Sequence, residues 1–323
     1  MIPLTWKPYR KSLASDIASL WNRALGEHFP MSAHLLRQNT EGAPSFQPND
    51  STVVTSQDQV VGYILTKRFH EPHPYLIERL ASTGWIEALI VDPAWQRKGL
   101  GRDLLAWAVC KLRSGGADKL YLGSGFCHFF PGVPAELPGL RDYFSKAGFR
   151  VLGVSHDLRG SLRGFAAPPS ALAAVTAVGG SVRPCRAEDI PALIAFLQAE
   201  FPGRWHFDTK RFLSLGGNPQ EIIILRQGQA VIGFAHVFHW RASYQGPPIY
   251  WHKLMGPHYG GLGPIGVAAG MRGKGLGLAL LQLALQHVAD VGVQDAVIDW
   301  TTLTDFYGRV GFTPWKTYIR MEG

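Results

Sequence analysis

The strongest constraint on the fold is a glycine-spaced basic turn that occurs twice, 176 positions apart. The first copy reads Gln96-Arg97-Lys98-Gly99-Leu100-Gly101, and the second reads Arg272-Gly273-Lys274-Gly275-Leu276-Gly277. A duplicated turn in a chain of 323 residues predicts two similar domains, each long enough to bury its own core.

Each turn lies between a short apolar strand and an apolar helix. The segments Trp85–Val91 and Pro264–Val267 precede the turns, and leucines at helical spacing follow Gly101 and Gly277. At a helix start the first N–H groups have no intrahelical partner, and the helix dipole is positive. Glycine removes the Cβ atoms that would hold a ligand's oxygens away from the backbone. The pattern therefore predicts a pyrophosphate site at each turn.

Both turns resemble the Q/R-x-x-G-x-G/A signature of the GNAT superfamily of N-acetyltransferases. Other elements of that family recur in the same order in both copies. They are an acidic residue in the first helix, a glycine within a strand, and a closing Gly-Phe pair: Asp16 and Asp189, Gly62 and Gly233, Gly148-Phe149 and Gly311-Phe312. The resemblance covers nearly the whole chain as two tandem copies.

The resemblance implies an α/β fold (an α+β mixed sheet) in which each domain is a twisted, mostly antiparallel sheet flanked by helices. We expect a GNAT-like domain at residues 1–160, a linker at 161–180 and a second GNAT domain at 181–323. The run Gly261–Gly266 also spells G-x-G-x-x-G, but it precedes a strand and contains Pro264. We interpret it as a loop and not as a dinucleotide fingerprint.

The resemblance also implies acetyl-CoA as the acetyl donor and assigns its phosphates to the turns. In the family's mechanism a backbone N–H, here that of Val267, stabilises charge on the thioester oxygen, as in an oxyanion hole. The predicted CoA-binding residues are Val91, Gln96, Arg97, Lys98, Gly99 and Gly101 in the first copy, and Val267, Arg272, Gly273, Lys274, Gly275, Leu276 and Gly277 in the second.

The two copies differ in the residue that would protonate the departing CoA thiolate. The family places a Tyr five residues before the Phe of Gly-Phe, and Tyr307 has that position in the second copy. Phe144 has it in the first, and phenylalanine has no proton to donate. Tyr143, the residue before Phe144, is displaced from that position by about 100° around the helix, so a local change of register would be needed for it to act as the donor. We therefore expect the second domain to carry catalysis and the first to be degenerate, structural, regulatory or substrate-covering.

The candidate bases favour the opposite assignment. Glu87 matches a place where many family members keep a carboxylate that removes a proton from the amine, whereas the second copy has Gly263 there. Asp299, His252, His258 or a water chain are the substitutes in the second domain. Asp299 is of most interest because an acid on an apolar strand needs a partner or a ligand.

The leading hypothesis is direct transfer of acetyl to the primary amine of a small molecule, such as an amino sugar or aminoglycoside. Two alternatives remain, a protein N-acetyltransferase and a CoA-binding sensor or scaffold without turnover. An aromatic set in the second domain is a candidate acceptor surface or, equally, core: Trp251, His252, Tyr259, Asp299, Trp300 and Trp315. The first domain also has thirteen extra residues around Gly123–Gly139. A long aromatic loop of this kind is commonly functional or packed against a neighbour, and the second domain's acceptor cleft is a candidate neighbour.

Composition excludes several other classes. The net charge is +8, but charged residues make up only 17% of the chain and form no long basic run, so we expect no nucleic-acid partner. Three cysteines without a C-x-x-C pair suit a cytoplasmic protein, and Cys110 is expected in the core. His236 and His239 fall on opposite faces of a strand, which predicts no metal site. We expect neither a signal peptide nor a membrane span.

Overall fold

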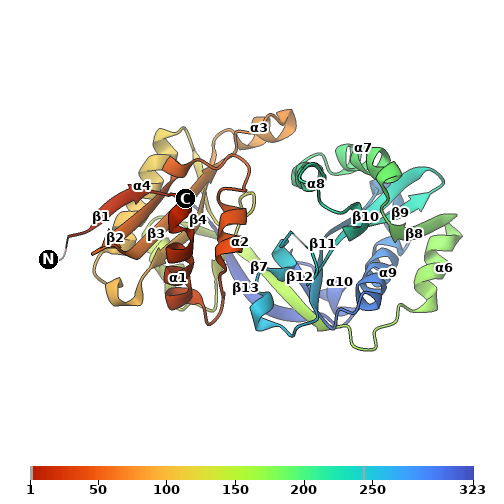
Figure 1. The fold of residues 1–323 in the computed structure, drawn as a ribbon. Helices are drawn as coiled ribbons and strands as arrows, with labels where there is room; N and C mark the ends of the chain where they lie inside the picture. Colours follow the sequence, from red (N-terminus) through yellow and green to blue (C-terminus); the bar gives the residue numbers. More distant parts are fainter. Residues whose placement is uncertain (1–2, 243) are drawn as a thin grey trace. The chain divides into compact units, whose positions relative to one another are not determined.

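The computed structural model describes residues 3–242 and 244–323, which form two compact units (Figure 1). The first unit comprises Met1–Ser155 with Lys316–Gly323, and the second comprises His156–Trp315. These bounds differ from the expected division at residues 160 and 181. Each unit takes one strand segment from the other half of the sequence, so the end of the chain belongs to the first unit.

The first unit is built on a sheet with the order β1-β2-β3-β4-β5-β13, in which only β4 and β5 are parallel. Its strands are β1 (Thr5–Pro8), β2 (Ser51–Ser56), β3 (Gln59–Arg68), β4 (Thr83–Val91), β5 (Lys119–Leu122), β6 (Val133–Pro134), the first half of β7 (Arg150–Ser161) and most of β13 (Thr313–Glu322). Its helices are α1 (Ala14–Leu25), α2 (Ala33–Asn39), α3 (Pro74–Leu80), α4 (Leu100–Ser114) and α5 (Leu140–Lys146).

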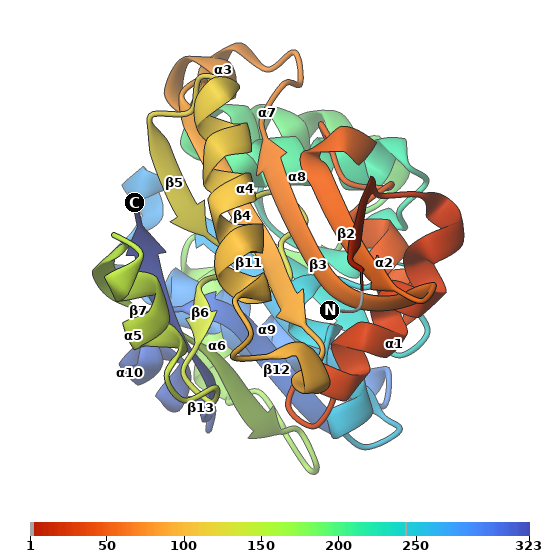
Figure 2. The same cartoon turned by 90° about the vertical axis from the view of Figure 1, so that its left-hand side faces the viewer.

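Helices cover both faces of this sheet, with α4 lying across β3 and β4 (Figure 2). The α4 residues Leu104, Ala108 and Leu112 recur at intervals of four and pack with Ile64 and Ile86 of the sheet. The helix α1 packs on β3 and β4 as well, and the indole N–H of its buried Trp21 donates to the carbonyl of Phe29 at 2.8 Å.

The second unit repeats this plan with the strand order β8-β9-β10-β11-β12-β7. The parallel pair is here β11 and β12. Its strands are β8 (Gly180–Pro184), β9 (Ile222–Gln227), β10 (Ala230–His239), β11 (Tyr259–Val267), β12 (Asp295–Thr301) and the second half of β7. Its helices are α6 (Pro169–Ala177), α7 (Ile190–Glu200), α8 (Arg204–Ser214), α9 (Leu276–Asp290) and α10 (Thr304–Gly308).

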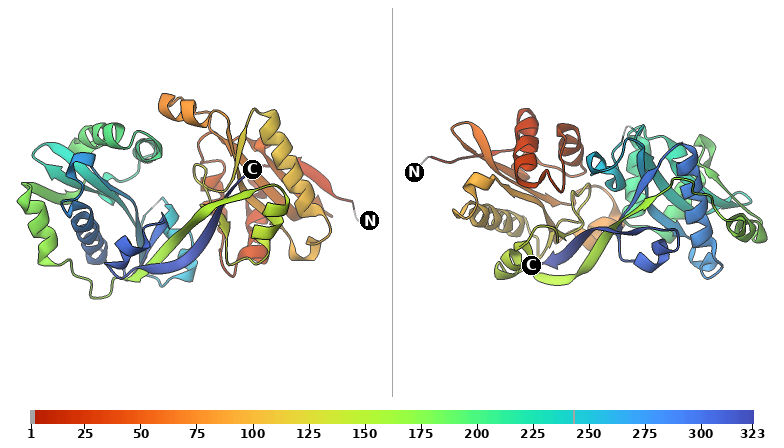
Figure 3. Two further views of the ribbon diagram at one scale, coloured as in Figure 1. Left: turned by 180° about the vertical axis from the view of Figure 1, so that it is seen from behind. Right: turned by 90° about the horizontal axis from the view of Figure 1, so that it is seen from below.

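In the second unit α6 and α9 pack on one face of the sheet, and α7 and α8 on the other (Figure 1). The expected linker, residues 161–180, lies within this unit, because Ala171 and Val175 of α6 are buried against α9. Figure 3 shows β7 and β13 running beside each other, as neighbours in the sheet order. The expected fold class is confirmed: a mixed, mostly antiparallel sheet flanked by helices.

Two local expectations were wrong, the loop at Gly261–Gly266 and the buried position of Cys110. The run Gly261–Gly266 is part of the strand β11 and not a loop. In the aromatic insertion, Phe129 and Phe130 are buried and contact Trp21 of the same unit. Cys110 is exposed, because it lies on the outer side of α4.

Two further findings bear on the excluded classes. Among the described residues, no group of three or more His, Cys, Asp or Glu side chains is arranged to hold a metal ion. No helix within residues 3–242 and 244–323 has both the length and the apolar character needed to cross a bilayer.

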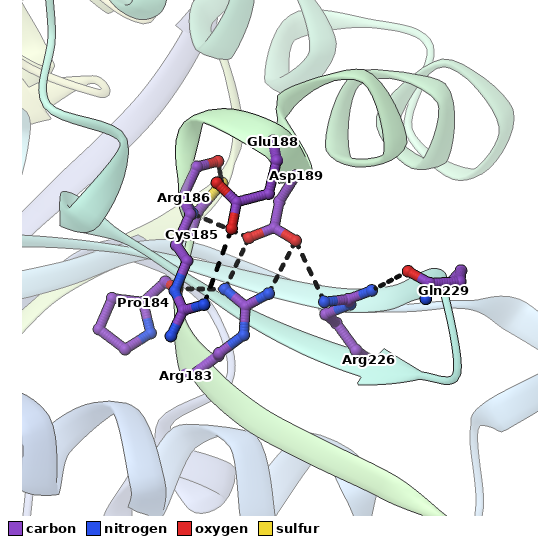
Figure 4. Close-up of polar contacts among 8 residues, drawn as sticks. All are labelled: Arg183, Pro184, Cys185, Arg186, Glu188, Asp189, Arg226 and Gln229. Carbon is purple, nitrogen blue, oxygen red and sulfur yellow. Dashed lines mark hydrogen bonds and ion pairs between the residues drawn. The ribbon is translucent and has the colours of Figure 1, made fainter.

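A buried carboxylate fixes the start of α7 in the second unit (Figure 4). Asp189, 4% exposed, accepts hydrogen bonds from both terminal nitrogens of Arg183 at 2.6 and 2.8 Å. It also accepts from the backbone N–H of Arg186 at 2.9 Å and pairs with Arg226 at 3.2 Å. The bidentate arginine holds the pKa of this carboxyl below its ordinary value.

We predict that Asp189→Ala lowers the free energy of unfolding by about 3 kcal/mol at neutral pH, because it removes a buried carboxylate and leaves two partly buried arginines without their counter-charge. The difference from wild type is fully present above the unfolded-state pKa of about 3.9 and disappears as the pH falls through the lower folded-state pKa. Urea denaturation followed by tryptophan fluorescence at several pH values measures this. The control is Glu188→Ala, since the Arg186–Glu188 pair is exposed and spans 3.7 Å. Equal losses in both variants would contradict the prediction.

Candidate active site

Both glycine turns have the same backbone shape at the start of a long helix. In the second unit Gly273 and Gly275 adopt left-handed conformations with φ of 76°, and Gly275 is the N-cap of α9. In the first unit Arg97 (φ 59°) and Gly99 (φ 94°) occupy the matching positions before α4. Each turn therefore presents the first N–H groups of a 15-residue helix.

Open space surrounds the second turn. A Cβ atom placed at Gly273, Gly275 or Gly277 would meet no atom within 4 Å. The predicted segment Arg272–Gly277 thus forms one exposed cradle at the positive end of the α9 dipole. The amine of Lys274 lies 3.6 Å from the sulfur of Met271, and that of Lys98 donates to the carbonyl of Ala94 at 2.8 Å.

The parallel strand pair opens beside each turn. In the second unit β11 pairs with β12 only through Tyr259–Leu262, and in the first unit β4 pairs with β5 only through Thr83–Ile86. Gly263 and Glu87 follow these paired residues directly. The two copies are therefore in the register predicted from the sequence, with Gly263 at the place of Glu87.

The backbone of Val267 faces this opening. Along a strand the N–H groups alternate between its two sides. Ala268 donates its N–H to Ile232 of β10 at 2.8 Å, so the N–H of Val267 points toward the opposite side, where β12 has already separated from β11. Val91 has the same place in the first unit, because Asp92 donates to Val61 at 2.9 Å.

Asp299 places a carboxylate over Gly263. A methyl group at residue 263 would overlap Oδ1 of Asp299, which extends across from the neighbouring strand β12. The carboxylate that the second copy lacks at position 263 is therefore supplied from an adjacent strand. This explains the departure from the family pattern, because only glycine leaves room for it.

The proton affinities of this site are set by burial and by neighbouring charge. The pKa of Asp299 is raised to about 8, mainly by burial and secondly by the Asp157 carboxylate, while Arg204 opposes the shift. Burial also raises the pKa of Tyr307, with the Asp299 charge as the second cause. Asp299 and Tyr307 thus lie near enough to influence each other.

The first unit contains a cleft of about 440 Å³ between β4, the first turn and α5. Four predicted CoA-binding residues line it, namely Val91, Gln96, Arg97 and Gly101. Tyr143 carries its hydroxyl to within 3.7 Å of the position that a Cβ at Gly101 would take. The Tyr143 side chain therefore reaches the turn without a change of helix register. Burial raises the pKa of its hydroxyl. Phe144 packs against Phe149 in the core.

The other acceptor-side candidates have different surroundings. Trp251 is buried, with 2% of its surface exposed. Trp315 lies under the guanidinium of Arg159, whereas Trp300 lies under that of Arg204 at 5.0 Å. His252 stacks on Tyr259, and burial lowers the pKa of His252. His258 packs edge-on against Trp240. Only Asp299 and Trp300 lie at the opening of the strands.

Sequence reasoning missed two residues of this region, Asp157 and Arg204. Both face Asp299 from other elements, Asp157 from β7 and Arg204 from α8. No motif marks either residue. The only signal was the apolar strand around Asp299, which required a partner for that acid.

Comparison with known proteins identifies the class. The model of the acetyltransferase (GNAT) family matches residues 14–130 and 190–312, one region in each half of the chain. The chain belongs to this family and is an N-acetyltransferase with two tandem GNAT domains. No protein matches in a search of curated sequences.

Solved structures resemble the chain over its full length. A GCN5-related glucosamine N-acetyltransferase region of a fungal multi-domain GH3 β-N-acetylglucosaminidase matches 100% of the chain with 26% identity and a TM-score of 0.88. The chain corresponds to 38% of that longer protein. A GCN5-related N-acetyltransferase from Sphaerobacter thermophilus covers 100% of the chain and 96% of its own (17% identity, TM-score 0.71). A tandem GNAT protein from the clavulanic acid biosynthesis pathway matches 99% of the chain and 98% of its own length, with 16% identity and a TM-score of 0.67.

We predict that Gly263→Ala lowers kcat for acetyl transfer by about tenfold or more, because the new methyl group displaces the Asp299 carboxylate. The affinity for acetyl-CoA should stay the same, since the cradle at α9 is untouched. Steady-state kinetics with calorimetric titration of acetyl-CoA measures both. Gly256→Ala is the matched control, because a Cβ there meets no atom within 4 Å. A Gly263→Ala enzyme as active as this control would contradict the placement of Asp299.

Proposed function

We propose that the chain transfers the acetyl group of acetyl-CoA to the primary amine of a small molecule, with an amino sugar of the glucosamine type as the first candidate. The acceptor class is supported by the fungal glucosamine N-acetyltransferase region, which shares 26% identity across the whole chain. We further propose that the second unit carries the reaction.

The observation that carries this proposal is the Asp299 carboxylate above Gly263. It lies where β11 and β12 separate, beside the exposed cradle Arg272–Gly277 and the outward N–H of Val267. The proposed base on β12, the proposed oxyanion donor on β11 and the proposed phosphate cradle at the start of α9 thus lie at the same opening. Glycines and helix N–H groups in this arrangement suit a pyrophosphate, so the residues present fit acetyl-CoA.

Each residue then has one task. Acetyl-CoA, when bound, supplies the activated acyl group. Asp299 takes a proton from the acceptor ammonium, so that the free amine attacks the thioester carbonyl. The N–H of Val267 donates a hydrogen bond to the carbonyl oxygen as negative charge builds there. Tyr307 gives its proton to the sulfur as the carbon–sulfur bond breaks, and the second proton lost by the attacking nitrogen restores the Tyr307 hydroxyl, which leaves an acetamide and free CoA.

A specific observation favours a second candidate, catalysis in the first unit. There the 440 Å³ cleft is lined by Glu87, the first turn and Tyr143 together. In this case Glu87 would be the base and the Tyr143 hydroxyl the proton donor. The two candidates differ in which tyrosine is needed for turnover.

We predict that Tyr307→Phe lowers kcat by about 10²-fold, a typical contribution of a general acid, with little change in the affinity for acetyl-CoA. Tyr143→Phe should keep wild-type turnover. Release of CoA, followed with a thiol reagent and glucosamine as the acceptor, measures both variants. The reverse result would assign catalysis to the first unit.

We also predict that glucosamine supports faster CoA release than a lysine-containing peptide at equal concentration. The physical reason is that Asp299, Val267 and Tyr307 act on one amine and one thioester. The reaction therefore requires no extended groove for a peptide. A panel of amino sugars, an aminoglycoside and a peptide tests the acceptor class. Faster turnover of the peptide would favour protein acetylation, whereas acetyl-CoA binding without any turnover would favour a sensor.

A further inference from the structure

We propose that Asp157, contributed by β7, is a positioning residue of the second unit's active site: its carboxylate holds a bulge in β12 that aims Asp299 at Gly263. The inference rests on the proposed role of Asp299 as the base. Asp157 precedes the second copy in the sequence and lies in β7, the strand that ends the first copy. A residue from the first half of the sequence would thus shape the site of the second.

The strand register shows the bulge. Ile298 of β12 is opposite Leu158 of β7, and Thr301 is opposite His156. Two residues of β12, Asp299 and Trp300, therefore face the single residue Asp157. An extra residue of this kind bends its strand and redirects the adjacent side chains. Here it turns Asp299 toward β11.

Asp157 secures this bulge through its side chain. Its Oδ1 accepts the backbone N–H of Trp300 at 3.0 Å, in place of the ladder bond that the bulge disrupts. Trp300 has φ of 42°, a left-handed conformation that is unfavourable for a residue with a side chain. The hydrogen bond to a carboxylate of which only 4% is exposed offsets that cost.

The charge of Asp157 acts on the same neighbour. The groups that face Asp299 are Asp157 from β7, Arg204 from α8 and Tyr307 from α10. After burial, the negative charge of Asp157 is the largest cause that raises the pKa of Asp299, and Arg204 lowers it. Asp157 therefore affects both where Asp299 points and the pH at which it takes up a proton.

Two substitutions separate these effects. Asp157→Asn keeps an oxygen that accepts the Trp300 N–H but removes the charge, so kcat at high pH should stay near wild type. The midpoint of the pH–kcat/KM profile should move down by about one pH unit, as expected for loss of a like charge. Asp157→Ala also removes the acceptor, and we expect kcat to fall at least about tenfold with an unchanged KM for acetyl-CoA.

Asp295→Asn is the matched control. Asp295 lies on the same strand β12 and also pairs across to β7, where it binds Arg159. Its substitution should lower thermal stability and leave the pH profile unchanged, because it lies away from the bulge. The acceptor amine titrates identically in all variants, so differences between profiles belong to the protein.

A measurement independent of turnover completes the test. Carboxyl ¹³C NMR titration of the full chain follows the protonation of Asp299, identified by its loss in Asp299→Asn, and the Trp300 amide shift reports its hydrogen bond. The proposal holds if Asp157→Asn lowers the midpoint of the Asp299 titration and Asp157→Ala shifts the Trp300 amide resonance. If these shifts occur but the enzyme turns over no amine, only the proposed function fails. An active enzyme whose Asp299 midpoint and pH profile do not respond to Asp157→Asn would overturn it.

Discussion

The rest of this protein depends on one parallel strand pair in each unit, β4 with β5 and β11 with β12, whose hydrogen-bonded pairing stops partway along the strands. A sheet that stayed paired would satisfy the backbone groups of β11 and leave no opening. Because pairing ends at Leu262, the N–H of Val267 faces outward, and Gly263 receives a side chain from the neighbouring strand. The helix start that follows then lies at the end of the same opening.

The two units show how one plan accommodates a carboxylate in two ways. In the first unit Glu87 is carried by the bulged strand β4 itself. In the second unit the strand has glycine, and Asp299 arrives from β12. A site assembled from two strands depends on the packing of both. Asp157 on β7 is the contact that ties the second strand in place.

Much of the fold was predictable because it depends on local chemistry. The order of strands, turns and helices follows from apolar periodicity and from glycine at left-handed positions, and the structure confirms the helices that begin at Leu100 and Leu276. The bounds of the units were not predictable, because β7 and β13 each contribute to both and strand exchange leaves no local signature.

The sequence alone determined the duplication, the two glycine-spaced basic turns and the family, because these are set by residue type and spacing. It also marked Tyr307 and Phe144 as different in chemistry. Only the tertiary structure decided that Tyr143 projects its hydroxyl over the first turn, that Gly263 makes room for Asp299 and that Asp157 faces the bulge. These facts depend on the strand register and on the side-chain directions of segments that are far apart in the chain. Tertiary packing sets both, and the neighbouring residues in the sequence do not.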